Sequence, residues 1–148
     1  AVRMTTNLGW LDSEIRGYQA LMDVAGQQQL VDLSGRDQAH APRRQTALGL
    51  DWQLSDTVSM QLNYQYKGAF YYSDSHSFKA KAAELVNARI SWQQDDLTLA
   101  VWTRNLLDKD YGVRGFYFGN DPRDEYSNKE WQQLGEPRRV GVTASYQF

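Results

Sequence analysis

The chain has 148 residues and carries 16 basic against 18 acidic side chains, a net charge of −2 that excludes the basic surface by which proteins bind nucleic acid. It contains no cysteine, so disulfide frameworks, thiolate metal sites and cysteine nucleophiles are excluded as well. No stretch reaches the roughly 18 consecutive apolar residues of a membrane-spanning helix. Aromatic residues make up 13% of the chain. A polar average combined with many aromatic residues is typical of membrane strands, in which only every second residue is apolar.

Six segments of the chain show the two-residue period of a β-strand. The period is clearest between residues 58 and 66, where every even position is apolar or aromatic and every odd position is polar. In chain order, the strands are predicted near 1–12, 43–54, 57–72, 83–93, 97–111 and 137–148. The fourth and fifth fit less cleanly, and in the fifth Trp102 falls on the polar side of the segment. Each segment is close to the ~10 residues that a tilted membrane strand requires.

The connections between these segments alternate between short and long. Residues 54–57 and 93–96 form short polar turns, whereas the connections near 13–42, 73–82 and 112–136 are long. Outer-membrane barrels place short turns in the periplasm and long loops outside the cell. The sequence therefore predicts an all-β fold, an antiparallel up-and-down segment of a transmembrane β-barrel, with Phe148 at the periplasmic end and the long loops extracellular.

Aromatic residues on the apolar side of the predicted strands fall at strand ends. Those at the upper ends are Trp10, Tyr64 and Tyr66, and those at the lower ends are Trp52, Trp92, Tyr146 and Phe148. Two such bands are expected at the two interfaces of a membrane. The alternative from another class is a soluble small β-barrel that binds a ligand and turns the same residues into a shared dry core. A passive outer-membrane porin also fits the strand pattern.

Residues 105–111 read Asn-Leu-Leu-Asp-Lys-Asp-Tyr, a run that resembles the N-L-x-D-K-x-Y signature in the penultimate strand of TonB-dependent outer-membrane receptors. The positions that carry this family motif include Asn105, Leu106, Asp108 and Tyr111. Residues 135–143, followed by a terminal aromatic residue, look like the last strand of the same family, and residues 7–15 resemble a strand further upstream. The resemblance implies a barrel of roughly 22 strands with a plugged lumen, of which this chain would supply the last six or so.

The resemblance also implies a function and a set of partners. The parent protein would lie in the outer membrane of a Gram-negative bacterium and take up a scarce nutrient, an iron chelate such as a ferric siderophore, with energy passed through TonB. Its other partners would be outer-membrane lipid and lipopolysaccharide, its own plug domain and the barrel-assembly machinery. The last strand resembles the signal that this machinery reads, carried here by Gly141, Tyr146 and Phe148. Because the sequence begins in mid-strand at Val2, we expect it to be part of a longer protein.

Two groups of residues are candidates for contact with a ligand. The first is an aromatic cluster in the loop near 112–136, consisting of Arg114, Phe116, Tyr117, Phe118 and Asn120. Alternatively, this segment extends the strand pair above the membrane, and its aromatic side chains pack on one another. The second group lies on the polar side of the strands and should face the lumen, where it would contact the plug, a passing ligand or water; it consists of Gln61, Asn63, Lys67, Asn87 and Arg89.

Paired arginines open two of the descending strands, at residues 43–44 and 138–139, and each pair follows a proline. Proline suits the first residue of a strand, where no ladder donor is needed. At the outer rim, the arginines could contact lipopolysaccharide phosphates. The simpler interpretation is that they are solvated rim charges.

No catalytic, metal or cofactor site is predicted. His40 and His76 each stand alone in a loop, so the spacing of a metal site or of a histidine base is missing. The acidic residues within 108–110 and 121–125 have the chemistry that calcium prefers, but solvated loop acids are the simpler interpretation. We therefore expect that the protein is not an enzyme.

Overall fold

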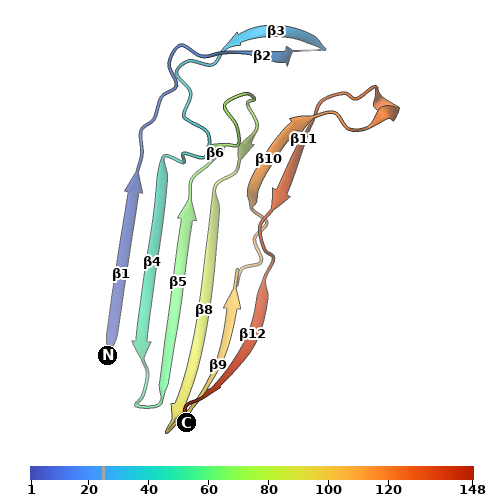
Figure 1. Cartoon of the computed structure of the whole chain (residues 1–148). Coiled ribbons are helices and arrows are strands. Elements are labelled where there is room, and N and C mark those ends of the chain that lie inside the picture. The colour runs from blue at the N-terminus through green and yellow to red at the C-terminus, as the bar shows by residue number, and fades with distance from the viewer. Residues whose placement is uncertain (25) are drawn as a thin grey trace.

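The computed structural model describes residues 1–24 and 26–148 and is built from antiparallel strands (Figure 1). The main sheet has six strands in the order β1-β4-β5-β8-β9-β12. Their bounds are Val2–Trp10, Arg44–Gln53, Val58–Lys67, Ala83–Gln94, Leu97–Arg104 and Arg139–Tyr146. Each strand pairs with the next of the six along the chain, so the predicted antiparallel up-and-down arrangement is confirmed. Among the described residues, no helix is long and apolar enough to cross a membrane.

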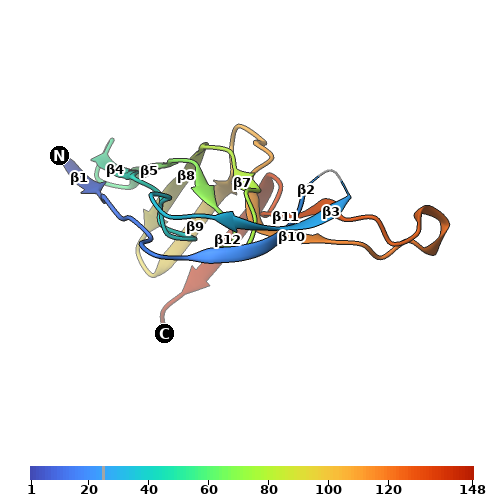
Figure 2. The same ribbon diagram turned by 90° about the horizontal axis from the view of Figure 1, so that it is seen from above.

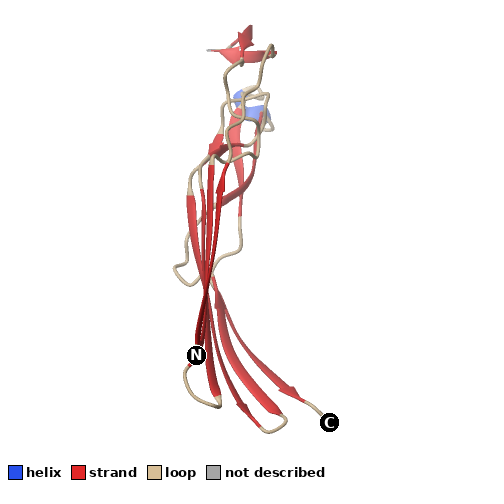
Figure 3. Cartoon of the chain, turned by 90° about the vertical axis from the view of Figure 1, so that its left-hand side faces the viewer, coloured by secondary structure: helices blue, strands red, loops and turns tan. Residues whose placement is uncertain are grey.

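The sheet is open. β1 and β12 form its two edges, and within the described part of the chain they do not pair with each other. A closed small barrel, as in the soluble alternative, would require that pairing. The view along the edge of the sheet shows how the strands twist along their length (Figure 3). This right-handed twist is the ordinary property of β-strands that allows larger sheets to close.

The register gives the sheet one apolar and one polar face. One row of side chains across the sheet is Met4, Leu50, Leu62, Ala88, Thr103 and Val140. The next row, on the opposite face, is Arg3, Asp51, Gln61, Arg89, Trp102 and Gly141. The apolar face covers no core, because Met4 is 77% exposed and Val142 is 73% exposed. A contiguous exposed apolar surface of this extent marks a surface that meets lipid or a partner.

The two ends of the sheet differ. The β4–β5 and β8–β9 turns lie at one end together with both termini, and the three longer connections lie at the other (Figure 1). In the first turn, the Ser55 hydroxyl accepts hydrogen bonds from the backbone N–H groups of Thr57 and Val58, at 3.4 and 3.1 Å. The second turn places Asp95 in the left-handed region with φ of 49°, which a two-residue hairpin turn requires and aspartate tolerates.

All three long connections contain hairpins, which lie beyond the end of the main sheet (Figure 1). Seen from above, β2–β3 and β10–β11 extend to the same side of the main sheet (Figure 2). Their strands are β2 (Gln19–Val24) with β3 (Gln27–Asp32), β6 (Phe70–Tyr71) with β7 (Lys79–Ala80), and β10 (Gly112–Phe118) with β11 (Lys129–Leu134). A short 3-10 helix, η1 (Pro122–Asp124), lies between β10 and β11. Antiparallel pairing satisfies the backbone groups of the paired residues in each connection, so the connections form hairpins rather than plain loops.

A small aromatic core joins the connections. Phe70, Tyr72 and Ala80 are buried, and Phe78 packs against them with its ring centroid 4.9 Å from that of Tyr72. Arg36, from the β1–β4 connection, donates a hydrogen bond of 2.7 Å to the His76 carbonyl oxygen, and its guanidinium lies 3.9 Å from the Tyr71 ring centroid. Two connections that are distant in sequence are thereby held together.

Trp102 lies on the polar face because Gly141 opposite it provides the space. A Cβ atom added at Gly141 would lie 2.3 Å from Cζ2 of the Trp102 ring, closer than atoms can approach. The indole N–H of Trp102 donates a hydrogen bond of 3.2 Å to the Thr143 hydroxyl on the same strand as Gly141. The ring therefore lies flat over the last strand and links β9 to β12.

We expect Gly141→Ala to destabilise the folded barrel by about 1–3 kcal/mol, since the new methyl group must displace the Trp102 ring. The measurement is the free energy of unfolding of the complete, membrane-assembled protein. The folded fraction is read from the different mobility of folded and unfolded protein on gels run without heating. Gly9→Ala is the matched control, because a Cβ there meets Gln45 at an ordinary 3.7 Å. Combining Gly141→Ala with Trp102→Leu should recover much of the loss. An equal effect of Gly9→Ala and Gly141→Ala would contradict this explanation.

Candidate functional site

The predicted lumen-facing residues share the polar face of the sheet. Gln61 lies opposite Arg89, and Asn63 lies opposite Asn87 in the β5–β8 ladder. The Gln61 amide donates a hydrogen bond of 3.1 Å to Asp51. Asp51 also accepts from Arg3 at 2.9 Å, which makes a polar chain across β1, β4 and β5. The structure thus places these side chains on one face, while their contact with plug or ligand stays a prediction.

Three members of this group, Asn87, Lys67 and Arg89, also make contacts outside the ladder of facing pairs. Asn87 accepts a hydrogen bond of 2.9 Å from the backbone N–H of Asn105, so its amide holds the end of β9. Lys67 stands at the top of β5, with its ammonium nitrogen 4.0 Å from the Phe70 ring centroid. Arg89 donates a hydrogen bond of 3.0 Å to the Ser91 hydroxyl on its own strand.

The motif at 105–111 forms a turn at the upper rim of the sheet. The strand predicted over 97–111 ends at Arg104, because Asn105 and Asp108 adopt positive φ values of 48° and 51°. Such left-handed backbone breaks a strand, and asparagine and aspartate are the residues other than glycine that adopt it most readily. The backbone N–H of Leu106 then donates to the Val86 carbonyl oxygen at 2.7 Å, which ties the turn to β8.

Three motif residues bind the chain that returns toward β12. The buried Asn105 amide donates to the carbonyl oxygens of Lys109 and Glu136, at 2.9 and 3.1 Å, and accepts from the Lys109 N–H at 3.0 Å. The Asp108 carboxylate accepts from the backbone N–H of Arg138 at 2.9 Å. The Tyr111 carbonyl oxygen accepts from the Gly135 N–H at 2.8 Å. The motif therefore acts as a clasp between the end of β9 and the start of β12.

A Cβ atom at Gly135 would overlap the Tyr111 ring, at 2.0 Å from Cζ. Glycine at 135 thus lets the tyrosine ring cover the returning backbone. The sequence signal for this contact was present in both matched segments, 105–111 and 135–143, but only the fold shows that the two touch.

Replacement of Asn105 should loosen this clasp. Asn105→Gly keeps the left-handed backbone accessible but removes the side-chain partner of backbone groups of Lys109 and Glu136, a loss of about 1–3 kcal/mol in the free energy of unfolding. Asn105→Ala adds the strain of a positive φ and should be worse. Urea unfolding of the assembled protein in lipid measures both. Leu107→Ala, at a side chain that is 51% exposed, is the control; a loss as large there would refute the clasp.

The β10–β11 hairpin separates the predicted aromatic cluster into two faces. Phe116 lies opposite Trp131, and Phe118, two residues further along β10, is diagonal to Trp131, with its ring centroid 6.2 Å from that of Trp131. These three side chains are 40–49% exposed on one face, together with Arg114. The segment therefore extends as a strand pair whose aromatic side chains pack on each other, which was the alternative interpretation of this region.

Tyr117 lies on the other face of the hairpin, with its ring centroid 6.1 Å from that of His76. Gly115 is on this face too, because a Cβ there would lie 2.2 Å from Cδ2 of Tyr72. Sequence reasoning missed Trp131, because its segment (Lys129–Leu134) shows little alternation and its partner Phe116 is known only from the register. Of the predicted ligand-facing residues, the hairpin thus brings Phe116 and Phe118 together and separates Tyr117 from them.

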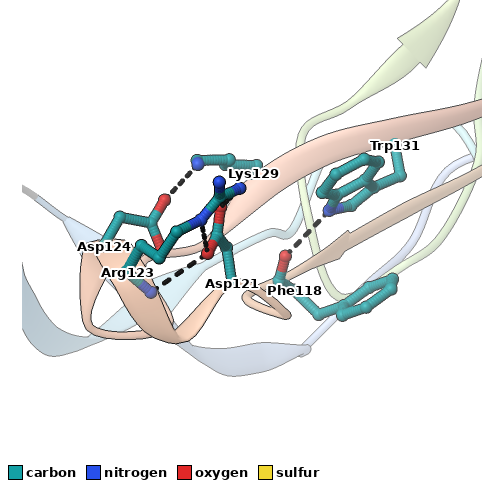
Figure 4. A network of polar contacts seen from close by, with 6 residues as sticks. All are labelled: Phe118, Asp121, Arg123, Asp124, Lys129 and Trp131. Atoms are coloured by element: carbon teal, nitrogen blue, oxygen red, sulfur yellow. Dashed lines mark hydrogen bonds and ion pairs between the residues drawn. The ribbon is translucent and has the colours of Figure 1, made fainter.

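At the tip of this hairpin, acidic side chains form hydrogen bonds and ion pairs with neighbouring basic side chains (Figure 4). Asp121 accepts three hydrogen bonds from Arg123, at 2.8, 2.9 and 3.0 Å, and Asp124 forms an ion pair with Lys129. Hydrogen bonding from Arg123 lowers the pKa of Asp121, and hydrogen bonding from Lys129 lowers the pKa of Asp124. Asn120 precedes this network and is exposed. In residues 1–24 and 26–148, no three acidic, histidine or cysteine side chains gather in a way that could hold a metal ion.

His76 belongs to the aromatic core rather than to a reactive site. Its Nδ1 accepts a hydrogen bond of 3.3 Å from the Phe78 N–H, which requires an unprotonated nitrogen. Burial, and then the nearby positive charge of Arg36, lower the pKa of His76. The ring therefore stays neutral and helps to fix the β6–β7 hairpin.

All four paired arginines have partners within the protein. Arg43 pairs with Asp37 at 2.9 Å, Arg138 with Asp108 at 3.6 Å and Arg139 with Glu136 at 3.1 Å. Arg44 lies over the Trp10 ring, 4.6 Å from its centroid. The three ion-paired side chains remain 51–59% exposed, so the pairs are rim charges that also support the local fold. Contact with lipopolysaccharide stays a hypothesis.

No family model matches the chain, and no curated protein matches it in sequence. Solved structures do match it in three dimensions. The siderophore receptor PiuA from Acinetobacter baumannii aligns over 97% of this chain and 19% of its own, with a TM-score of 0.72 and 15% identity. The ferric yersiniabactin uptake receptor FyuA from Yersinia pestis aligns over 82% of this chain and 19% of its own, with a TM-score of 0.65 and 16% identity.

The ferric citrate transporter FecA in its unliganded form aligns over 78% of this chain and 18% of its own, with a TM-score of 0.60 and 19% identity. The chain has the fold of part of a siderophore-receptor barrel. The resemblance to TonB-dependent receptors that the motifs indicated is thereby confirmed at the level of fold. The chain spans less than one fifth of the length of each of these three proteins.

Proposed function

We propose that these residues form the last six strands of the barrel of an outer-membrane receptor in a Gram-negative bacterium. The receptor takes up a ferric siderophore or a similar iron chelate with energy passed through TonB. The observation that carries the proposal is the match to siderophore-receptor PiuA over 97% of the chain, in an open sheet with one apolar and one polar face. An open sheet of this kind completes its edge pairing only within a larger barrel.

In this proposal each partner meets a particular face or end of the sheet. Lipid meets the face that carries Met4, Leu50 and Val142, and the plug domain of the complete receptor meets the face that carries Gln61 and Arg89. The short turns lie on the periplasmic side, and the hairpins lie outside the cell. Tyr146 and Phe148, whose ring centroids are 5.4 Å apart at the end of the chain, serve the barrel-assembly machinery as a recognition signal.

The exposed aromatic face of the β10–β11 hairpin suits a first contact with ligand. Phe116, Phe118 and Trp131 present flat rings on a two-stranded hairpin, and Arg114 adds a positive charge on the same face. Functional residues are commonly carried on loops that a rigid scaffold positions. In this proposal the clasp at 105–111 is that scaffold, since it fixes the point at which the hairpin leaves the sheet.

The test is iron uptake by cells that carry the complete gene. We expect uptake of radioactive iron from at least one ferric chelate, lost when TonB is deleted and restored when it is supplied. A matched comparison is Phe116→Ala with Trp131→Ala against Tyr126→Ala, a side chain that is 62% exposed at the hairpin tip. The first pair should reduce uptake about tenfold, by analogy with aromatic hot spots. Diffusion of small solutes that is independent of TonB, without chelate uptake, would indicate a passive porin instead.

A further inference from the structure

A cavity of about 340 Å³ opens at the top of the polar face, where β5, β8 and the start of β10 meet. It is lined by Gln65, Lys67, Phe70, Lys81, Ala83, Leu85, Tyr111, Gly112 and Val113. Gln65 lies opposite Leu85 and Lys67 lies opposite Ala83 in the β5–β8 ladder, so these four side chains share the polar face. The clasp supplies the Tyr111 side of the cavity, and the aromatic core supplies Phe70.

The charged side chains that line this cavity are all positive. Its only ionised lining side chains are Lys67 and Lys81, and no acidic residue lines it. Within residues 1–24 and 26–148, neither lysine takes part in an ion pair, whereas Arg3 lower on the same face is paired with Asp51. Two lysine side chains without an ion-pair partner in the lining of one cavity favour an anion, since each ammonium group would gain a charge-assisted hydrogen bond.

The remainder of the lining is apolar. Phe70, Leu85 and Val113 form the walls with Ala83, and the Tyr111 ring adds a flat surface with a polar edge. The Lys67 ammonium already lies 4.0 Å from the Phe70 ring centroid, an arrangement that cations adopt over aromatic faces. A site with apolar walls and a few convergent polar groups is the usual form of a small-molecule site.

We propose that this cavity binds an anionic ferric chelate that carries aromatic groups, of the catecholate class, in preference to a neutral hydroxamate chelate. A ferric ion surrounded by catecholates has a net negative charge, which Lys67 and Lys81 would meet, and its rings would lie against Phe70, Tyr111 and Leu85. A neutral chelate gains nothing from the two ammonium groups. The inference rests on the proposed function and specifies the substrate class of the receptor.

The experiment measures binding to the complete purified receptor by fluorescence quenching, with a ferric tris-catecholate and a ferric tris-hydroxamate as probes. The variant is Lys67→Gln with Lys81→Gln, which removes the charges but keeps side-chain length. The matched control is Lys79→Gln, which removes the same charge two residues from Lys81 at a position that does not line the cavity. Altered mobility on unheated gels confirms that each variant is folded.

We expect the double variant to raise the Kd of the catecholate complex by about tenfold. The Kd should change little with Lys79→Gln, and the preference for the anionic probe should weaken at high salt. If the hydroxamate binds as well as the catecholate, or the double variant leaves the catecholate Kd unchanged, the inference is wrong while the proposed receptor function stands. If neither ferric chelate binds the folded wild-type receptor, the inference is wrong, and the TonB-dependent uptake experiment then decides separately whether the proposed function stands with another iron chelate.

Discussion

Every part of this structure depends on a two-residue period that is kept in register across six strands. In a hydrocarbon environment each backbone N–H and C=O must be paired, so a spanning sheet cannot tolerate a slip. A slip of one residue in β5 would carry Gln61 and Asn63 to the apolar face and Leu62 to the polar one. The unbroken alternation from Val58 to Tyr66 therefore fixes the register of the central strands, and the neighbours β4 and β8 follow from it.

The rim is where the regular pattern ends, and specific residues take over there. Asn105 and Asp108 break β9 with left-handed backbone and then bind the returning chain through Glu136 and Arg138. Because this clasp fixes the base of the β10–β11 hairpin, it also sets the position of Tyr111 in the cavity with Lys67 and Lys81. A short motif read as a family signature thus has a physical role that joins the sheet to the candidate ligand site.

Much of the sheet was predictable from sequence, because alternation is a local property. The less regular features were not, because they depend on contacts between distant segments. Trp102 broke the alternation of its segment, and only the pairing with Gly141 across β9 and β12 explains it. The hairpins above the sheet were expected as loops, since a run such as Gln27–Asp32 gives no apolar face to recognise.

In the candidate site, too, contacts between distant segments could not be predicted from the sequence. Phe116 and Phe118 could be selected from a local aromatic cluster, but Trp131 joins them only through the register of the hairpin. Tyr117 looked equivalent to its neighbours in sequence, yet strand geometry turns it to the opposite face, toward His76. Lys81 was not selected at all, because it becomes part of a cavity only when β5 and β8 are paired.

The central claim is that the apolar face meets lipid and the polar face meets water or plug. These 148 residues contain no cysteine, so single cysteines can be placed at Leu48 and Ile90 on one face and at Gln61 and Asn87 on the other. Each is labelled with a fluorophore in the complete, membrane-embedded receptor, with any cysteine elsewhere in that receptor replaced by serine. We expect a quencher dissolved in lipid to quench only the first pair, and a quencher dissolved in water to reach the second pair wherever the plug leaves it open. Quenching of both faces by the lipid-dissolved probe, or of the polar face alone, would contradict this assignment of the two faces.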